Sequence, residues 1–169
     1  MMTIKSKMIE PFNAQIKSEF TASAQYIAIA AYFDALGLKE LGDFFFRQSE
    51  EERIHGMKFV QFMLETGAKP TIPSTPELRN EFDDPADAVQ FALDQENKVT
   101  NEINTLVDLA ISQSDHASNN FLQWFVTEQV EELDTMSTLL QTIKLAGSNL
   151  LLVEEYVRRN PQHAGELAA

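Results

Sequence analysis

Glycine and proline, the residues that most often interrupt helices, are clustered in this 169-residue chain, and their placement constrains the fold more than any other feature. Gly37, Gly67 and Gly147 each follow a long run in which these residues are rare, and four of the six prolines lie within residues 68–87. The runs predict helices over about residues 5–36, 39–66, 85–113, 118–146 and 149–160, with a crossover loop over 67–84. Asp84 followed by Pro85 is typical of a helix N-cap and first helical position.

The order of these segments, two pairs of long helices joined by one long loop, is typical of an antiparallel four-helix bundle with a single crossover. In the second helix the apolar residues recur at the alternating steps of three and four that a bundle requires, in the rows Phe45, Glu52, Phe59 and Gln48, His55, Phe62. Neither helix pair could bury its apolar stripe alone, so we expect residues 1–169 to form one all-α domain, closed by a short fifth helix.

Each long helix carries polar residues where its apolar stripe should be continuous. These residues are Glu19 in the first helix, Glu52 and His55 in the second, Glu96 in the third, and Gln129 and Glu132 in the fourth. Each lies near the middle of its helix, and the middles of antiparallel helices share one level. We therefore expect four carboxylates, a histidine, a glutamine and Tyr26 to meet in one buried layer.

Four buried carboxylates need a compensating charge. Burying even one uncompensated carboxylate costs on the order of several kcal/mol, and four together would repel one another. Protonation is one solution. Pairing with a base is another, but Arg53 follows Glu52 directly and should point about 100° away from it. The remaining solution is a pair of metal ions, for which carboxylates with one imidazole favour iron or manganese, with zinc possible. A lone Glu-x-x-His would be weak evidence, whereas four matched glutamates are strong evidence.

The composition excludes several classes of partner. A net charge of −13 and a pI near 4.5 argue against nucleic acid and anionic membranes, since both attract basic surfaces. The acidic surface is either an ordinary solvated surface or one that attracts cations. The chain has no cysteine, which fits a reducing compartment, and it shows neither a signal peptide nor a membrane-spanning run, so we expect a cytoplasmic protein.

Four segments together resemble the bacterial non-haem ferritins over nearly the whole chain. They are NAQIKSEFTASAQY (13–26), SEEERIHGMKF (49–59), LDQENKVT (93–100) and FLQWFVTEQVEEL (121–133). The resemblance implies a centre that oxidises iron, in which Glu19, Glu52 and His55 hold the first ion. Glu52 would bridge to a second ion, which Glu96 and Glu132 complete. Gln129 would lie beside that second ion and hydrogen-bond water or a bound oxygen species.

The resemblance also implies roles for residues around this centre. Tyr26 matches a tyrosine next to the ferritin centre, and it would either supply a proton or an electron, or simply hydrogen-bond a ligand carboxylate. Glu51, Glu128 and Glu131 match the third iron site of some bacterial ferritins, although they could also form an ordinary acidic helix face. We expect Trp124 to pack in the core, and His116 and His163 to lie on the surface.

The chain differs from related di-iron proteins at informative positions. Gln129-x-x-Glu132 stands where bacterioferritins and rubrerythrins have a second Glu-x-x-His, so we expect the second ion to be held more loosely and passed onward. Arg53 stands where bacterioferritins have a haem-ligating methionine, which predicts no haem. The apolar segment LLLV at 150–153 needs a partner surface, and in ferritins the equivalent helix packs around the fourfold axis of a 24-subunit shell.

Together with these residues, the resemblance implies an iron-storage protein that binds Fe(II), oxidises it with O2 or peroxide, and mineralises Fe(III) within a homo-oligomeric cage. Two alternatives remain open. One is a di-iron or di-manganese peroxidase that uses the same centre without storage, and the other is a helical interaction protein whose buried acids are protonated or paired.

Overall fold

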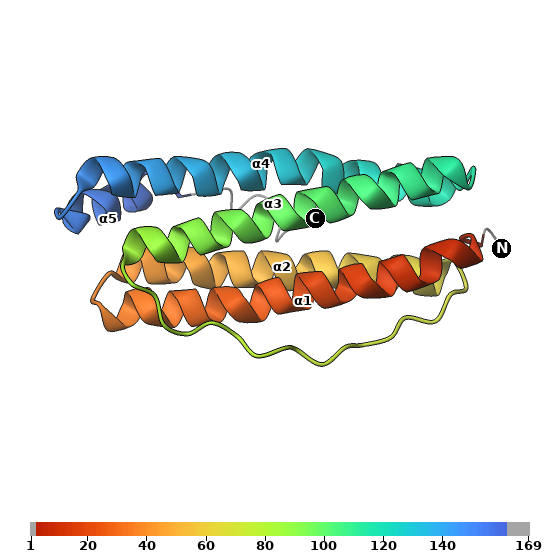
Figure 1. Ribbon diagram of the computed structural model, residues 1–169, viewed down its shortest axis with the longest axis horizontal. Helices are drawn as coiled ribbons and strands as arrows, with labels where there is room; N and C mark the ends of the chain where they lie inside the picture. The colour runs from red at the N-terminus through yellow and green to blue at the C-terminus, as the bar shows by residue number, and fades with distance from the viewer. Residues whose placement is uncertain (1–2, 162–169) are drawn as a thin grey trace.

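A computed structural model of the chain describes residues 3–161, and within that range it contains five helices and no strand. The helices are α1 (Ser6–Ala35), α2 (Lys39–Glu65), α3 (Pro85–Ser112), α4 (His116–Ala146) and α5 (Leu150–Arg159). Figure 1 shows the four long helices side by side, with α1 antiparallel to α2 and α3 antiparallel to α4. The all-α four-helix bundle with a single crossover and a short fifth helix is therefore confirmed.

Local sequence signals account for the helix ends. Gly37 and Gly67 follow α1 and α2 with φ of 81° and 78°, a left-handed conformation that glycine adopts without steric cost. Asp84 caps α3, because its side chain accepts a hydrogen bond from the Asp87 N–H. Asp115 caps α4 in the same way through the Ser118 N–H, so that α4 begins at His116 and not at the expected residue 118.

The crossover loop runs along the outside of α1 from one end of the bundle to the other (Figure 1). Two polar side chains of α1 hold it there. Asn13 accepts a hydrogen bond from the Thr71 N–H at 2.7 Å. Gln25 exchanges two hydrogen bonds with the backbone of Arg79, at 2.7 and 3.0 Å. The loop is thus hydrogen-bonded to α1 near both of its ends, although it has no secondary structure of its own.

The apolar core is divided into two clusters, one towards each end of the bundle. One includes Phe12, Ile16 and Phe59, and the other includes Phe33 and Phe45. Each long helix passes from one cluster to the other, and Glu19, Glu52, His55, Glu96, Gln129 and Glu132 lie in the gap between the clusters. The gap falls between Ile16 and Tyr26 in α1, between Phe45 and Phe59 in α2, between Ala92 and Val99 in α3, and between Phe125 and Met136 in α4. The structure therefore contains the single polar layer that the sequence predicts.

Helix α5 packs against α2 and α4 at one end of the bundle. Its apolar residues divide between two environments, since Val153 and Val157 are buried, whereas Leu151 and Leu152 are exposed. Among the described residues, no helix is both long enough and apolar enough to cross a bilayer.

Candidate metal centre

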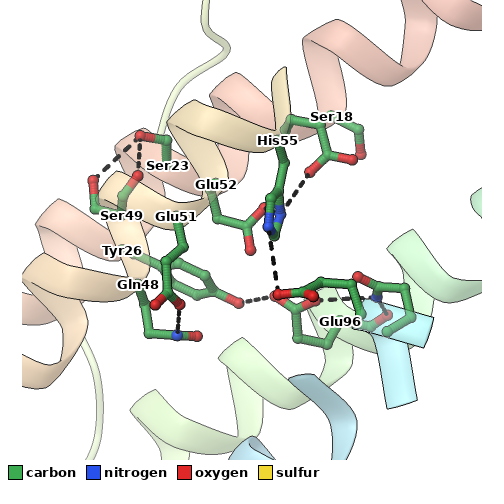
Figure 2. Close-up of polar contacts among 12 residues, drawn as sticks. Ser18, Ser23, Tyr26, Gln48, Ser49, Glu51, Glu52, His55 and Glu96 are labelled. Atoms are coloured by element: carbon green, nitrogen blue, oxygen red, sulfur yellow. Dashed lines mark hydrogen bonds and ion pairs between the residues drawn. The ribbon is translucent and has the colours of Figure 1, made fainter. Parts of the chain in front are cut away.

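Five ionisable side chains meet in the polar layer, and all four long helices contribute to it. Glu19, Glu52, His55, Glu96 and Glu132 each expose 4% of their surface or less. Figure 2 shows Glu52, His55 and Tyr26 pointing towards Glu96 from the other side of the layer. Antiparallel helices place their midpoints at one level, and the spacing of the apolar stripe turns these side chains inward.

Glu19, Glu52 and His55 form the first group that could hold a metal ion, with one ligand atom from each lying within 4.8 Å of the others. The His55 Nδ1 atom faces this group, at 3.4 Å from Glu52 Oε2 and 4.0 Å from Glu19 Oε2. Glu52 and His55 are three residues apart in α2, so they lie on the same face, one turn from each other.

Glu52, Glu96 and Glu132 form a second group under the same 4.8 Å limit. Glu52 therefore belongs to both groups. A carboxylate has two oxygens, so it can bind one ion through each and bridge the pair. The two groups together have the form of a two-ion site joined at Glu52.

Three carboxylate oxygens in this layer lack any hydrogen bond from the described part of the chain. They are Glu19 Oε2, Glu52 Oε1 and Glu132 Oε2, and all three are buried. Buried acceptors are nearly always satisfied in folded proteins, and leaving one unpaired costs about 1–3 kcal/mol. Unpaired oxygens that converge on one space suit a cation, which supplies the missing interaction to several of them at once.

No lysine or arginine among the described residues forms an ion pair with these carboxylates. The ion-pair contacts of the layer join His55 to Glu19, Glu52 and Glu128 only. Arg53 is exposed, as expected, and donates hydrogen bonds to Glu50 on the surface, one of them 2.9 Å long. The repulsion between the carboxylates is therefore not relieved by a basic side chain other than the imidazole.

The electrostatics of the metal-free layer follow from this crowding. Burial, followed by the charge of Glu52, raises the pKa of Glu19 well above its ordinary value. The pKa of Glu132 is likewise well above its ordinary value, because of burial and the charge of Glu96. Burial and Glu52 raise the pKa of Glu96 to about 8. Burial alone would lower the pKa of His55, but the carboxylates of Glu52, Glu128 and Glu19 outweigh it and raise that pKa.

Tyr26 and Gln129 both contact Glu96. The Tyr26 hydroxyl donates a hydrogen bond to Glu96 Oε1, which fits the structural role considered for this residue. Gln129 Nε2 lies 3.3 Å from Glu96 Oε2 and 3.0 Å from the Thr100 hydroxyl. Since Thr100 Oγ1 donates in turn to the Glu96 carbonyl, the Gln129 amide is held on the α3 side of the layer.

The three residues of the expected third site differ in their placement. Glu128 is half-buried, and its Oε1 lies 3.8 Å from His55 Nε2; it forms a third possible metal-binding group with His55 and Glu132. Glu51 is half-buried and accepts a hydrogen bond from Gln48, and burial is the main cause that raises its pKa to about 7. Glu131 is exposed and belongs to none of the three groups found among the described residues.

Comparison with known proteins agrees with this geometry. A model of the ferritin-like domain matches residues 9–146. The chain is 46% identical over 151 residues to "Ferritin BfrB" of Mycolicibacterium smegmatis, covering 89% of this chain and 83% of the relative. The chain belongs to the ferritin family. A "Bacterial non-heme ferritin" of Staphylococcus haemolyticus is 31% identical over 146 residues, covering 86% of this chain and 88% of the relative.

Solved ferritin structures have the same fold. The structure of an open-pore ferritin from the archaeon Archaeoglobus fulgidus superposes with a TM-score of 0.89 at 33% identity, over 93% of this chain and 97% of that one. The expected resemblance to bacterial ferritins is thus confirmed across nearly the whole bundle.

Aromatic side chains surround the imidazole of this ferritin. Trp124 is half-buried and meets His55 edge to face, with 5.3 Å between ring centroids, while Lys58 lies over the indole at 4.2 Å. Trp124 therefore packs at the edge of the core and not within it. His116 is exposed at the start of α4, and His163 lies outside the described residues.

Gly56, which follows His55, lets the Phe20 ring of α1 pack closely against α2. A Cβ atom at Gly56 would come within 2.6 Å of the Phe20 ring, so any larger residue would displace a side chain adjacent to Glu19. The sequence alone did not indicate this role, because the spacing of residues within α2 does not show which side chain of α1 lies over Gly56.

Gln15 is a further residue of the layer that the periodicity missed. It is buried, and its Nε2 donates a hydrogen bond to Glu19 Oε1 at 2.8 Å. The available signal was its spacing, because a residue four positions before Glu19 lies on the same helical face.

Proposed function

We propose that this ferritin stores iron and oxidises it at an intra-subunit centre that takes up two Fe(II) ions per chain. Glu19, Glu52 and His55 hold the first ion, and Glu96 and Glu132 complete the second site. Glu52 bridges the two ions. The observation that carries the proposal is that Glu52 belongs both to the group with Glu19 and His55 and to the group with Glu96 and Glu132.

The donor set fits this chemistry. Carboxylate oxygens are hard, charged ligands, and they stabilise Fe(III) relative to Fe(II). One imidazole and several carboxylates therefore favour loss of an electron from each bound ion, with O2 or hydrogen peroxide as the acceptor. The repulsion among the carboxylates, which protonation relieves in the metal-free protein, is relieved by the bound ions instead.

The second ion is held by carboxylates alone. The group Glu52, Glu96 and Glu132 has no imidazole, and Gln129 faces it with a neutral amide. We propose that this site binds iron more weakly than the first and releases oxidised iron towards a mineral store. Glu51, Glu128 and Glu131 would form a third site that receives it.

The assembly that would store the mineral is a cage of 24 copies. The exposed apolar residues Leu145, Leu151 and Leu152 lie on and beside α5, and they supply the partner surface that such a shell needs. A cage of 24 chains of 19.1 kDa has a mass of about 460 kDa, which size-exclusion chromatography separates readily from a dimer. We also propose that the protein binds no haem, because Arg53, which donates to Glu50 on the surface, stands where bacterioferritins have their haem-ligating methionine.

The test of the proposed function is aerobic addition of Fe(II) to metal-free protein, following absorbance and O2 uptake as the iron-to-chain ratio rises. Storage with ferroxidase activity predicts a fast phase that saturates near two ions per chain, followed by slower uptake of hundreds of ions per particle. A fast phase without further uptake would favour a peroxidase. The absence of any fast phase would contradict the proposed centre.

A further inference from the structure

The two oxygens of Glu19 lie in different environments. Oε1 accepts the 2.8 Å hydrogen bond from Gln15 Nε2, whereas Oε2 has no hydrogen-bond partner among the described residues. The unpaired Oε2 is the oxygen that faces the imidazole, 4.0 Å from His55 Nδ1. The hydrogen bond and the candidate metal position are therefore at opposite oxygens of one carboxylate.

Gln15 is well placed to maintain this difference. It exposes only 3% of its surface, and it lies within α1, one helical turn before Glu19. The same part of α1 is hydrogen-bonded to α3, because the Ser18 hydroxyl donates to Glu102 Oε2 at 2.6 Å. Gln15 also lines a groove of about 610 Å³ between α1 and α3, and Glu19 is not among the residues that line it.

We propose that Gln15 is a positioning residue of the metal centre, which holds Glu19 so that only Oε2 is offered to the first ion. This inference rests on the proposed function. An amide N–H can only donate, so it keeps Oε1 engaged and prevents the carboxylate from rotating to bind through both oxygens. Partners of this kind fix the orientation of metal ligands, and their loss typically costs about 10- to 100-fold in metal affinity or activity.

A purely structural role would have different consequences. Gln15 could instead serve only to fill the space between α1 and α3 and to give its own buried amide a hydrogen-bond partner. Its replacement would then lower the Tm without changing metal binding. Gln25 provides the matched control, because it is also a glutamine of α1 that exposes 3% of its surface. Its amide hydrogen-bonds the loop backbone at Arg79 and, within the described part of the chain, makes no hydrogen bond to a residue of the metal centre.

The experiment compares Gln15→Met and Gln25→Met with the wild-type cage. Each is titrated anaerobically with Fe(II), and separately with Co(II), whose visible absorption weakens as its coordination number rises. Gln15→Met should weaken binding of the first ion by about 10- to 100-fold and reduce the Co(II) absorption per bound ion, because Glu19 is free to bind through both oxygens. Gln25→Met should bind the metals as the wild type does, although both variants lower the Tm.

Wild-type affinity and an unchanged Co(II) spectrum in Gln15→Met would overturn the inference while leaving the proposed function intact. Absence of tight metal binding by the wild type would instead refute the proposed function, and the inference with it. If Gln15→Met does not assemble, Gln15→Asn replaces it in the experiment. The shorter side chain keeps an amide, but its N–H no longer reaches Glu19. Gln15→Asn should show the same weakening, and wild-type binding by that variant would equally overturn the inference.

Discussion

Tyr26 in α1 donates a hydrogen bond from its phenol to Oε1 of Glu96 in α3, across the layer where the carboxylates meet. This hydrogen bond stabilises the ionised form of Glu96, and so it opposes the burial and the Glu52 charge that raise the pKa of Glu96 to about 8. Tyr26 thus makes Glu96 a better metal ligand near neutral pH, whatever its part in electron transfer.

Replacing Tyr26 by Phe should therefore shift binding of the second ion to higher pH. Without the phenol the pKa of Glu96 rises further, so protons compete more strongly with the metal below about pH 8. Anaerobic Fe(II) titrations between pH 6 and 9 would measure the shift. The two proteins should converge at the alkaline end of this range, and a difference that persisted there would indicate that Tyr26 acts other than through the Glu96 pKa.

Replacing Glu52 should affect both ions of the proposed centre, because Glu52 belongs to the groups assigned to the first and the second ion. Glu52→Gln should remove the fast oxidation phase and slow the reaction by more than about 100-fold, since outer partners of metal ligands alone contribute about 10- to 100-fold. Glu132→Gln should weaken the second ion while leaving the group of Glu19, Glu52 and His55 intact. Metal analysis under anaerobic conditions would distinguish the variants, and equal losses in both would argue against a bridging role for Glu52.

The fold and the polar layer could be predicted from sequence because both depend on position along a helix. A helix of regular pitch converts the spacing of Glu19 from Ile16, or of Glu52 from Phe45, directly into a shared face. Antiparallel packing then converts a position near the middle of each helix into a common height. The five helices and the converging carboxylates follow from these two regularities.

Contacts that depend on side-chain rotamers or on distant segments could not be predicted in this way. The spacing puts Gln15 on the same helical face as Glu19, but it does not show that the Gln15 side chain turns towards that carboxylate. Gln25 binds a loop more than fifty residues later in the chain, and the spacing gives no sign of that contact. Glu131 is adjacent to Glu132 in sequence but exposed, since neighbouring residues on a helix point about 100° apart.

The metal-free protein should become less stable as the pH rises from about 4.5 to about 8. Burial and neighbouring charges raise the pKa of Glu19, Glu96 and Glu132 in the folded state, that of Glu96 from an ordinary 4.5 to about 8. In this window the folded protein holds protons that the unfolded chain releases, so rising pH favours unfolding. The contribution of these protons to the free energy of unfolding is complete below about pH 4.5. It is lost as the pH rises through the pKa that each carboxyl group has in the folded protein.

Thermal unfolding of chelator-treated protein at several pH values would measure this effect. Glu96→Gln is the matched variant, because it keeps the shape of the side chain but cannot titrate, and its Tm should fall less steeply between pH 5 and 8. Parallel curves for the two proteins would show that Glu96 does not contribute. Bound metal should reverse the trend, since metal competes with these protons and binds more tightly as the pH rises.

The proposed third site can be tested through the unequal placement of its residues. Glu128 approaches His55 and Glu132, whereas Glu131 is exposed. Glu128→Gln should therefore reduce the number of ions bound per chain by one, and Glu131→Gln should have a smaller effect on the affinity of the same ion. Equilibrium dialysis against Fe(II) without oxygen would measure both. If neither variant changed the stoichiometry, these residues would form only an acidic helix face.

The anchoring of α5 gives a last prediction, about assembly. The Glu154 carboxylate accepts hydrogen bonds from the backbone N–H groups of Glu40 and Leu41, at 2.9 and 3.0 Å. Helix α2 has no side-chain cap of its own at Leu38, so a residue of α5 satisfies the start of α2. This contact fixes α5 with Leu151 and Leu152 facing outward, towards the proposed neighbours in the cage.

Glu154→Ala should lower the free energy of unfolding by about 0.5–2 kcal/mol, the usual effect of losing a helix cap, and should increase the fraction of incompletely assembled protein. The adjacent Glu155→Ala is the control, because Glu155 pairs only with Arg158 and Arg159 on the exposed side of α5 among the described contacts, and such surface pairs contribute little. Chemical denaturation and size-exclusion chromatography would compare the two variants. If Glu155→Ala impaired assembly as much as Glu154→Ala, the loss would reflect the charge of α5, and the contact with α2 would not be what orients this helix.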